Sequence, residues 1–484
     1  MIQQATAREG LVQSAIGFSS RVGTQLCTIG VVLFAIRSLA ISDFGAFAIA
    51  SAFMFLFRRI FYVGPYEYML QTPHRATLNG SCLAANSLFA LGSTLLILVI
   101  SLGSKWIFRS ELVGELLRLM APALFLTMLT SWFEALLLRR QQVTRYYIYT
   151  VSGEIVGAAI ALWGLATGIG VYALVLQTYG RLAVLLFLQI TSREQDIYTG
   201  YDLGYALKII RWSGSRYATV IVNFFSVYGS DIMIGVLLTP TATGLFRAAS
   251  RIVTALTDLF AQPLQKIAQT NLSARRAHGL PLDHSWLGMF SAVGAVGWAT
   301  LAALACVAHD LVPAVLGAHW REAAPVVVVM CIVRGLPILD ATTVSMLVCG
   351  QRRGFVFNTQ IITAVGVVVS AAISARFGVL MVAMALGIVL SGQSIALCIA
   401  CCRLSHVRAQ EFLQSMGVAL LPSASVIAAV SLYHLAGGQS GESLWVLARV
   451  LAVAAAGAGV GLAIIRSDLA RSASLLAPLR PANI

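Results

Sequence analysis

The chain has 484 residues, of which 58% are hydrophobic and only 11% are charged, whereas charged residues make up about 25% of a typical soluble protein. This composition excludes a large soluble enzyme and predicts a protein embedded in a membrane. The net charge of +14 does not indicate nucleic-acid binding, because the basic residues are scattered through short connections, as they are in membrane proteins. The eight cysteines lie in apolar segments, where thiols behave as small hydrophobic side chains, so neither disulfides nor a metal site is expected.

A membrane-spanning helix needs about twenty mostly apolar residues. Two pairs of the predicted helices have very short connections, at residues 168–170 and 375–378, whose sequences Gly-Ile-Gly and Ala-Arg-Phe-Gly predict tight turns. Basic residues are concentrated on the side that both termini share, which predicts that both termini are cytoplasmic. In chain order, fourteen spans are predicted at about 14–36, 44–64, 79–101, 116–138, 146–166, 169–190, 213–238, 244–263, 286–308, 323–347, 355–374, 378–402, 416–435 and 444–465.

Two stretches of the chain, 39–51 and 238–250, read as copies of each other. Glycine, phenylalanine, alanine and serine recur in register, at Gly45/Gly244, Phe47/Phe246, Ala50/Ala249 and Ser51/Ser250. Because the copies keep the order of their elements, they indicate a parallel repeat. Internal repeats in a membrane protein are typical of transporters.

Weaker matches extend the repeat. Pro65 and Pro263 are predicted to end the second helix of each half, and residues 139–141 and 351–353 are predicted to form equivalent turns. Leu119-Met120-Ala121-Pro122 is matched with Glu322-Ala323-Ala324-Pro325. We therefore expect an all-α polytopic membrane protein of about fourteen transmembrane helices. Its predicted parts are a six-helix bundle over 1–195, a second six-helix bundle over 196–408, and two additional helices with a cytoplasmic tail over 409–484.

Several charged residues fall inside the predicted spans, where each costs about 2.5–3.5 kcal/mol on insertion scales. Such residues persist where they face a wet cavity or an ionic partner, so a polar lumen between the halves is predicted. Structural ion pairing, for example between Arg251 and Asp258, is the alternative, whereas Arg58, Arg59 and Arg181 are expected to reach the membrane interface. The candidates for substrate binding are Arg21, Gln25, Arg216, Asn223, Arg247, Arg251 and Arg334, and those for ion coupling are Glu134, Glu154 and Asp258.

Arginine remains charged and offers a planar pair of donors that matches phosphate. A cavity lined by arginines would therefore accept an anionic group, such as a pyrophosphate or an acidic sugar headgroup, and disfavour cations. No phosphate-binding loop for ATP is present in the sequence. No catalytic set or cofactor motif is recognised, so the sequence does not predict an enzyme.

The chain resembles the polysaccharide-transporter branch of the multidrug/oligosaccharidyl-lipid/polysaccharide exporter superfamily. The segments that carry this resemblance are 21–25, 37–39, 43–47, 243–246 and 312–325, and it covers nearly the whole chain. It implies two six-helix bundles, often with two more helices, that alternate access to a central cavity. It also implies a flippase in the bacterial inner membrane, which moves undecaprenyl-diphosphate-linked oligosaccharides for the assembly of O antigen, capsule or exopolysaccharide.

The implied partners are the lipid-linked oligosaccharide, membrane lipid, H⁺ or Na⁺, and proteins of polysaccharide assembly. Three other functions stay open on the sequence alone. A lipid II flippase would share the span count and a cationic cavity, and a multidrug exporter would share the superfamily but usually places an acid in the first helix. A polysaccharide polymerase would need a large external loop, and the loop candidates His309, Asp310 and His319 lack a nucleophile or metal set.

Overall fold

The computed structural model describes residues 2–72, 77–191, 200–280, 282–405, 407–437 and 444–466. Within these ranges the chain forms α-helices and three short 3₁₀ helices, and no strand. Twelve helices are long and apolar enough to cross a membrane, or thirteen when one bent helix pair is counted as a span. The structure therefore confirms an all-α, polytopic membrane protein.

The chain divides into two compact units. Unit 1 comprises Met1–Phe224 with Thr239–Gly244, and unit 2 comprises Phe225–Leu238 with Leu245–Ile484. The chain passes from one unit to the other inside α10 (Leu203–Leu237), between α10 and α11 (Pro240–Ala277), and again near the start of α11. The predicted division into bundles at 1–195 and 196–408, with two additional helices, stays a prediction.

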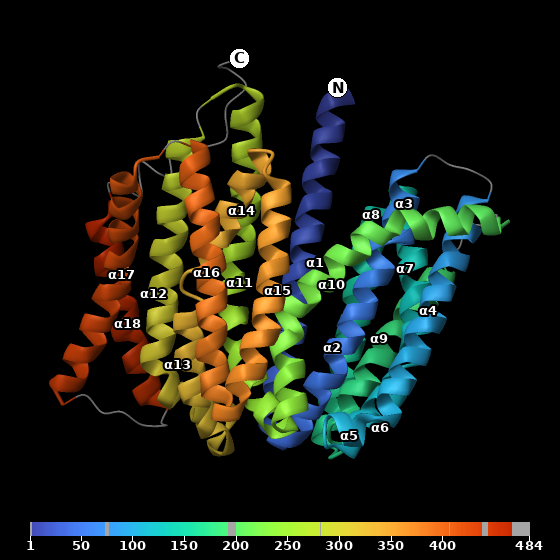
Figure 1. Ribbon diagram of the computed structural model, residues 1–484, viewed down its shortest axis with the longest axis horizontal. Coiled ribbons are helices and arrows are strands. Elements are labelled where there is room, and N and C mark those ends of the chain that lie inside the picture. Colours follow the sequence, from blue (N-terminus) through green and yellow to red (C-terminus); the bar gives the residue numbers. More distant parts are fainter. Residues whose placement is uncertain are drawn as a thin grey trace. The chain divides into compact units, whose positions relative to one another are not determined.

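Unit 1 is a helical bundle (Figure 1). Within it, α8 packs against both α1 and α9, while α7 packs against α4 and α9. Gly168 and Gly170 adopt φ angles of +81° and +69° between α8 and α9, which confirms the predicted tight turn. The helices that contribute to unit 1 are α1 (Ile2–Ser38), α2 (Ile41–Val63), α3 (Pro65–Gln71), α4 (Leu78–Leu102), α5 (Ser104–Ile107), α6 (Glu111–Met120), α7 (Ala123–Arg139), α8 (Val143–Ala166), α9 (Tyr172–Thr191), part of α10 (Leu203–Leu237) and the start of α11 (Pro240–Ala277).

Unit 2 holds most of the later helices. The last two, α17 and α18, pack against each other and against α12, and α15 and α16 form a hairpin. Gly378 has a φ of +94° in the connection of that hairpin, as the sequence predicts. The helices that contribute to unit 2 are the end of α10, most of α11 (Pro240–Ala277), α12 (Asp283–Leu316), η1 (Ala318–Ala323), α13 (Ala324–Val333), η2 (Pro337–Leu339), α14 (Asp340–Cys349), α15 (Arg353–Ser374), η3 (Ala375–Phe377), α16 (Val379–Ser405), α17 (Ala409–Leu435) and α18 (Leu444–Ile464).

Two of the predicted spans differ from the structure. The eighth, 244–263, is part of α11, which runs for 38 residues through Pro263, so the prediction that Pro263 ends this helix is wrong. A proline inside a helix removes one backbone donor and crowds the preceding turn, which kinks a helix without always ending it. The tenth, 323–347, is interrupted between α13 and η2 and bends by 50°.

The matched prolines of the sequence analysis also occupy different positions. Pro122 lies between α6 and α7, whereas Pro325 lies in the first turn of α13, where a proline needs no donor. Both positions share an Ala-Pro pair, but the local sequence does not specify where the helix begins.

The predicted equivalent turns do share one backbone geometry. Gln141 and Gln351 both have a φ of 61°. In each turn, the amide of the following residue donates to the carbonyl five residues earlier, from Gln142 to Leu137 and from Arg352 to Leu347, at 3.0 and 2.9 Å. This is the Schellman pattern that ends helices. Helices α7 and α14 therefore end in the same backbone geometry, with Gln141 corresponding to Gln351, and the duplication itself stays a prediction.

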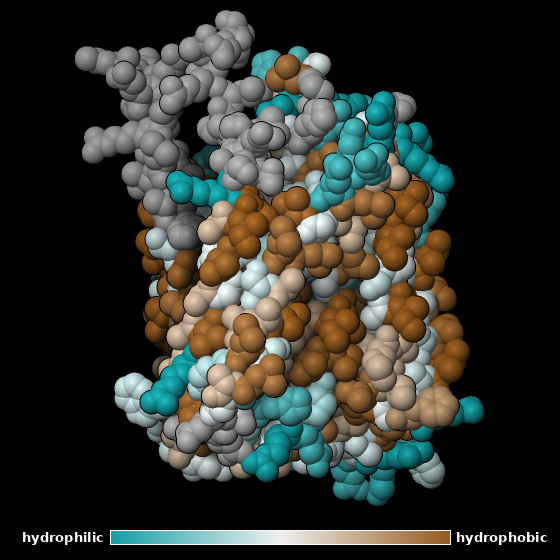
Figure 2. Space-filling model, turned by 90° about the vertical axis from the view of Figure 1, so that its left-hand side faces the viewer, coloured by the Kyte–Doolittle hydropathy of each residue, from teal (hydrophilic) through white to brown (hydrophobic). Residues whose placement is uncertain are grey.

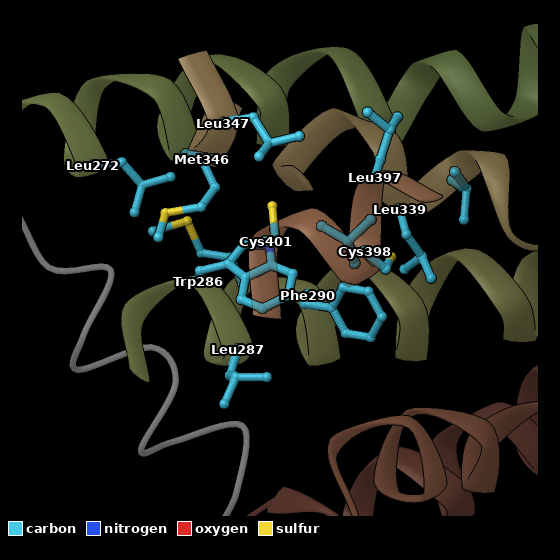
Figure 3. Close-up of a cluster of buried hydrophobic side chains, with 14 of the residues drawn as sticks. Leu272, Trp286, Leu287, Phe290, Leu339, Met346, Leu347, Leu397, Cys398 and Cys401 are labelled. Atoms are coloured by element: carbon cyan, nitrogen blue, oxygen red, sulfur yellow. The ribbon is translucent and has the colours of Figure 1, made fainter. Parts of the chain in front are cut away.

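Unit 2 has the surface and the core of a protein that spans a membrane. Figure 2 shows hydrophobic side chains forming a band between two hydrophilic rims on the face that carries α17 and α18. Behind it, buried side chains from α11, α12, α14 and α16 gather around Trp286 and Phe290 (Figure 3). A second cluster joins α12 to α17 and α18 through Val307, Val426 and Val450, so the last two helices are an integral part of this unit.

Candidate functional site

The two copies of the repeat meet each other through their matched glycines in unit 1. A β-carbon on Gly45 would collide with the carbonyl oxygen of Pro240, and one on Gly244 would collide with the carbonyl oxygen of Ile41. Ile41 and Pro240 are themselves matched positions of the repeat. The contact is therefore reciprocal, as it is between copies related by a two-fold axis. Glycine is required because the backbones of α2 and α11 approach too closely for any side chain.

Three residues after Gly244, in the part of α11 that belongs to unit 2, Arg247 forms a buried ion pair with Asp231 of α10. Nη1 of Arg247 lies 2.8 Å from Oδ2 of Asp231, and the two side chains are 10% and 1% exposed. The guanidinium also lies 4.7 Å from the ring centre of Tyr228. Because the carboxylate compensates the charge of Arg247, this residue serves as a structural anchor, while its predicted contact with substrate stays a prediction.

Arg251 follows one turn later on α11. Its charge is repelled by Arg247 and attracted by Asp231 and Asp258, but no carboxylate of the described residues lies within ion-pair distance of it. The side chain is half-buried, and that of Asp258 is exposed. The pairing of Arg251 with Asp258 considered from the sequence is thus electrostatic but not a direct ion pair.

Arg334 occupies the end of α13, at the interruption before η2. The carboxylates of Asp258 and Asp340 both attract it. Asp340 begins α14 and accepts a hydrogen bond from the Ser394 hydroxyl at 3.1 Å, while its other carboxylate oxygen is buried without a partner among the described atoms. Unit 2 thereby brings three predicted residues, Arg251, Asp258 and Arg334, into one electrostatic neighbourhood.

Arg216 lies in unit 1, on α10. Its Nε is 3.1 Å from Oε2 of Glu67, and its guanidinium stacks 3.4 Å from the ring centre of Trp212. The ring of Trp212 meets Tyr68 edge-on. The arginine side chain is nevertheless 31% exposed, so it combines a fixed orientation with access for a ligand.

The remaining polar candidates for substrate binding lie at the surface of their helices. Arg21 and Gln25 are exposed on α1, and Asn223 is exposed on α10. The i, i+4 spacing of Arg21 and Gln25 puts them on the same face of α1. Their contact with substrate stays a prediction.

Glu134 and Glu154 belong to a buried polar network in unit 1. Glu134 is 5% exposed and is hydrogen-bonded with Tyr62, whose ring lies 5.8 Å from the guanidinium carbon of Arg58. Glu154 accepts from Nη1 of Arg181 at 2.8 Å, and both side chains are 17% exposed. Arg181 was expected to reach the membrane interface, and the structure places it in this pair instead. Glu134 on α7 and Glu154 on α8 thus each have a partner on another helix, Tyr62 and Arg181, and their role in ion coupling stays a prediction.

The Glu154–Arg181 pair gives a test between a structural and an ion-coupling role. Glu154→Gln should lower the free energy of unfolding by about 3 kcal/mol, because it leaves a buried guanidinium without its counter-ion. The double variant Glu154→Leu/Arg181→Met should regain most of the stability, as measured by thermal unfolding in detergent. Transport by this stable double variant would show a structural role, and its loss would show that the acid itself is needed.

Several partners in these networks are absent from the sequence-based candidates. They are Tyr62, Glu67, Trp212, Tyr228, Asp231 and Ser394. Each lies on a different helix from the residue it contacts, apart from Trp212, which precedes Arg216 by one turn. The i, i+4 spacings of Trp212 with Arg216 and of Arg58 with Tyr62 are the signals that the sequence offers for these contacts.

Within the described ranges, no group of three His, Cys, Asp or Glu residues could hold a metal ion. Cys398, Cys401 and Cys402 share one end of α16, and the Cys401 thiol donates to the Thr343 carbonyl. These cysteines therefore pack as part of the core of unit 2 (Figure 3).

Residues 35–325 match a family described as polysaccharide biosynthesis protein. This match spans more than half of the chain, which therefore belongs to that family. No curated protein matches the chain.

Solved structures show the same fold at low sequence identity. The lipid II flippase MurJ in an inward closed conformation is 14% identical, with a TM-score of 0.75, over 95% of this chain and 100% of that one. An inward-facing MATE family multidrug transporter of the MOP superfamily is 14% identical, with a TM-score of 0.54, over 82% and 96%. The eukaryotic MATE transporter AtDTX14 is 12% identical, with a TM-score of 0.51, over 85% and 99%. The superfamily fold predicted from the sequence is confirmed.

Proposed function

We propose that this protein is a flippase of the bacterial inner membrane for oligosaccharide repeat units linked to a polyprenyl diphosphate, with undecaprenyl diphosphate as the carrier. Its family and a fold shared with a lipid II flippase support a transporter of this superfamily. The structural support for an anionic substrate is Arg251. It is a half-buried cation inside a membrane protein, without a carboxylate of the described residues at ion-pair distance.

The chemistry assigns different roles to neighbouring arginines. Arg247 is neutralised by Asp231 and holds α10 against α11. Arg251 lies one turn away and has no ion-paired carboxylate among the described residues. Its planar guanidinium can therefore donate two hydrogen bonds to a pair of diphosphate oxygens. Arg216, Arg334, Arg21, Gln25 and Asn223 are proposed to line the path of the sugar headgroup, while the prenyl tail stays in lipid.

Transport is proposed to proceed by alternating access, with both termini on the cytoplasmic side. An ion gradient would supply the energy, because one charge that crosses a potential of 100 mV exchanges about 2.3 kcal/mol. Asp258 is the exposed acid of the predicted coupling set, whereas Glu134 and Glu154 are engaged with Tyr62 and Arg181. We therefore place Asp258 first among the coupling candidates for H⁺ or Na⁺.

Arg251→Ala is expected to reduce polysaccharide export at least about tenfold, because a charge-assisted hydrogen bond contributes about 1.5–3 kcal/mol and tenfold corresponds to about 1.4 kcal/mol. The variant should insert into the membrane at the normal level, since no carboxylate of the described residues loses an ion-paired arginine. Arg251→Lys should be equally defective if paired donors are needed, and milder if charge suffices. Arg376→Ala, in the exposed turn before α16, is the control. Normal export by Arg251→Ala would contradict the assignment.

The alternative with a specific observation in its favour is transport of lipid II, because the fold extends over the whole of a lipid II flippase. The purified full chain can be placed in vesicles that hold either lipid II or an undecaprenyl-diphosphate oligosaccharide, each with a fluorescent headgroup. Chemical reduction of the outer-leaflet fluorophore then measures transfer between leaflets. Faster transfer of the oligosaccharide lipid supports the proposal, and transfer of lipid II alone supports the alternative.

A further inference from the structure

A cavity of about 790 Å³ lies within unit 2, between α12, α16 and α17. Its walls are almost entirely apolar, with Phe290, Ile395, Cys398 and Phe412 among them. Phe290 and Cys398 also belong to the buried cluster of Figure 3. The cavity is therefore an opening at the edge of a packed core, with walls that an apolar chain can contact.

Arg403 and Arg408 line one end of this cavity. Arg403 lies in the last turn of α16, and Arg408 immediately precedes α17. Both side chains are exposed, and neither has an ion pair with a carboxylate of the described residues. The backbone amide of Val407 donates to the carbonyl of Cys402 at 3.2 Å, which fixes the connection that carries the two arginines.

We propose that this cavity binds an anionic phospholipid, with its phosphate on Arg403 and Arg408 and an acyl chain along α16. Arginine pairs at the end of a membrane helix lie at headgroup depth, where they bind phosphate. The deeper lining residue Ser394 is nine residues before Arg403, which is about 14 Å along a helix. Half of the hydrocarbon core is about 15 Å thick, so the cavity has the depth of one leaflet.

The proposal is for a resident lipid, independent of the transported substrate. A substrate must carry its headgroup across the membrane, whereas these arginines hold a phosphate at one helix end. The deep end of the cavity includes Leu336 and Leu339, which both lie within the interruption between α13 and α14. An acyl chain there would pack against this interruption and stabilise the bent pair.

The test compares phosphatidylglycerol with phosphatidylcholine of identical acyl chains, added to the purified full chain in detergent. Thermal unfolding should show a larger rise of Tm with phosphatidylglycerol. The half-saturating concentration should become roughly thirtyfold higher in Arg403→Gln/Arg408→Gln, since each arginine near a lipid surface contributes about a fivefold factor. Arg353→Gln, an exposed arginine at the start of α15, is the matched control and should bind normally.

A second variant keeps the arginines and obstructs the cavity. Ala409→Trp places an indole at its lining and should also reduce the phosphatidylglycerol response. Equal effects of the two lipids on the unaltered protein would overturn the proposal, as would an unaltered response in both variants. Displacement of phosphatidylglycerol by an equal concentration of undecaprenyl diphosphate would also overturn it, because the cavity would then belong to the transported lipid.

Discussion

Asp231→Ala is expected to lower the free energy of unfolding by about 3–5 kcal/mol, the cost of leaving one partner of a buried ion pair uncompensated. The Asp231 side chain is 1% exposed, and that of its partner Arg247 is 10% exposed, so water cannot replace the carboxylate. In cells, the variant should accumulate to a much lower level. Thermal unfolding of the purified protein measures the effect.

The pair itself should be replaceable. Asp231→Leu/Arg247→Met removes both charges together, and buried ion pairs replaced by apolar residues of similar volume often cause little loss of stability. Asp258→Ala is the control for thermal unfolding alone, because that acid is exposed. A stable double variant that still transports would show that Arg247 anchors α11 without touching substrate. Unchanged unfolding of Asp231→Ala would contradict the structural role.

Gly45→Ala and Gly244→Ala should each disrupt the contact between the duplicated helices. Each new methyl group would collide with a backbone carbonyl, which cannot rotate away as a side chain does. Overpacking of this kind costs about 1–3 kcal/mol. Because the contact is reciprocal, the two variants should have similar losses of Tm and of transport.

Gly92→Ala provides the control for the glycine contact. It lies in α4, and a β-carbon there meets no atom within 4 Å, so its Tm should stay close to that of the unaltered protein. Normal folding and transport of both Gly45→Ala and Gly244→Ala would contradict the close approach. A defect in only one of them would contradict its reciprocity.

Much of the fold could be predicted because membrane helices and turns are local properties. Apolar runs located the spans, and glycine placed the turns at Gly168 and Gly378. Recurrent residues identified the helices that meet at Gly45 and Gly244. The course of α11 was harder, because Arg247, Arg251 and Asp258 lower its apolar character and Pro263 resembles a helix end.

The site was less accessible to sequence reasoning. The i, i+4 spacing of Arg247 and Arg251 puts them on one face of a helix, but this spacing does not specify which helix lies opposite. Asp231 neutralises Arg247 and Tyr62 meets Glu134 only through tertiary packing. The sequence therefore does not distinguish a charged residue that forms a structural ion pair from one that is available to a ligand. The arrangement of the helices makes this distinction.

Removing the gene from its host and extracting the lipid-linked saccharides tests the central claim most directly. The proposed flippase predicts that complete repeat units accumulate on the polyprenyl carrier and stay inaccessible to reagents added from the periplasmic side. Restoring the unaltered gene should clear them, and Arg251→Ala should not. Unchanged pools of lipid-linked saccharide would contradict the account, and so would accumulated units that already reach the periplasm, as expected for loss of a polymerase.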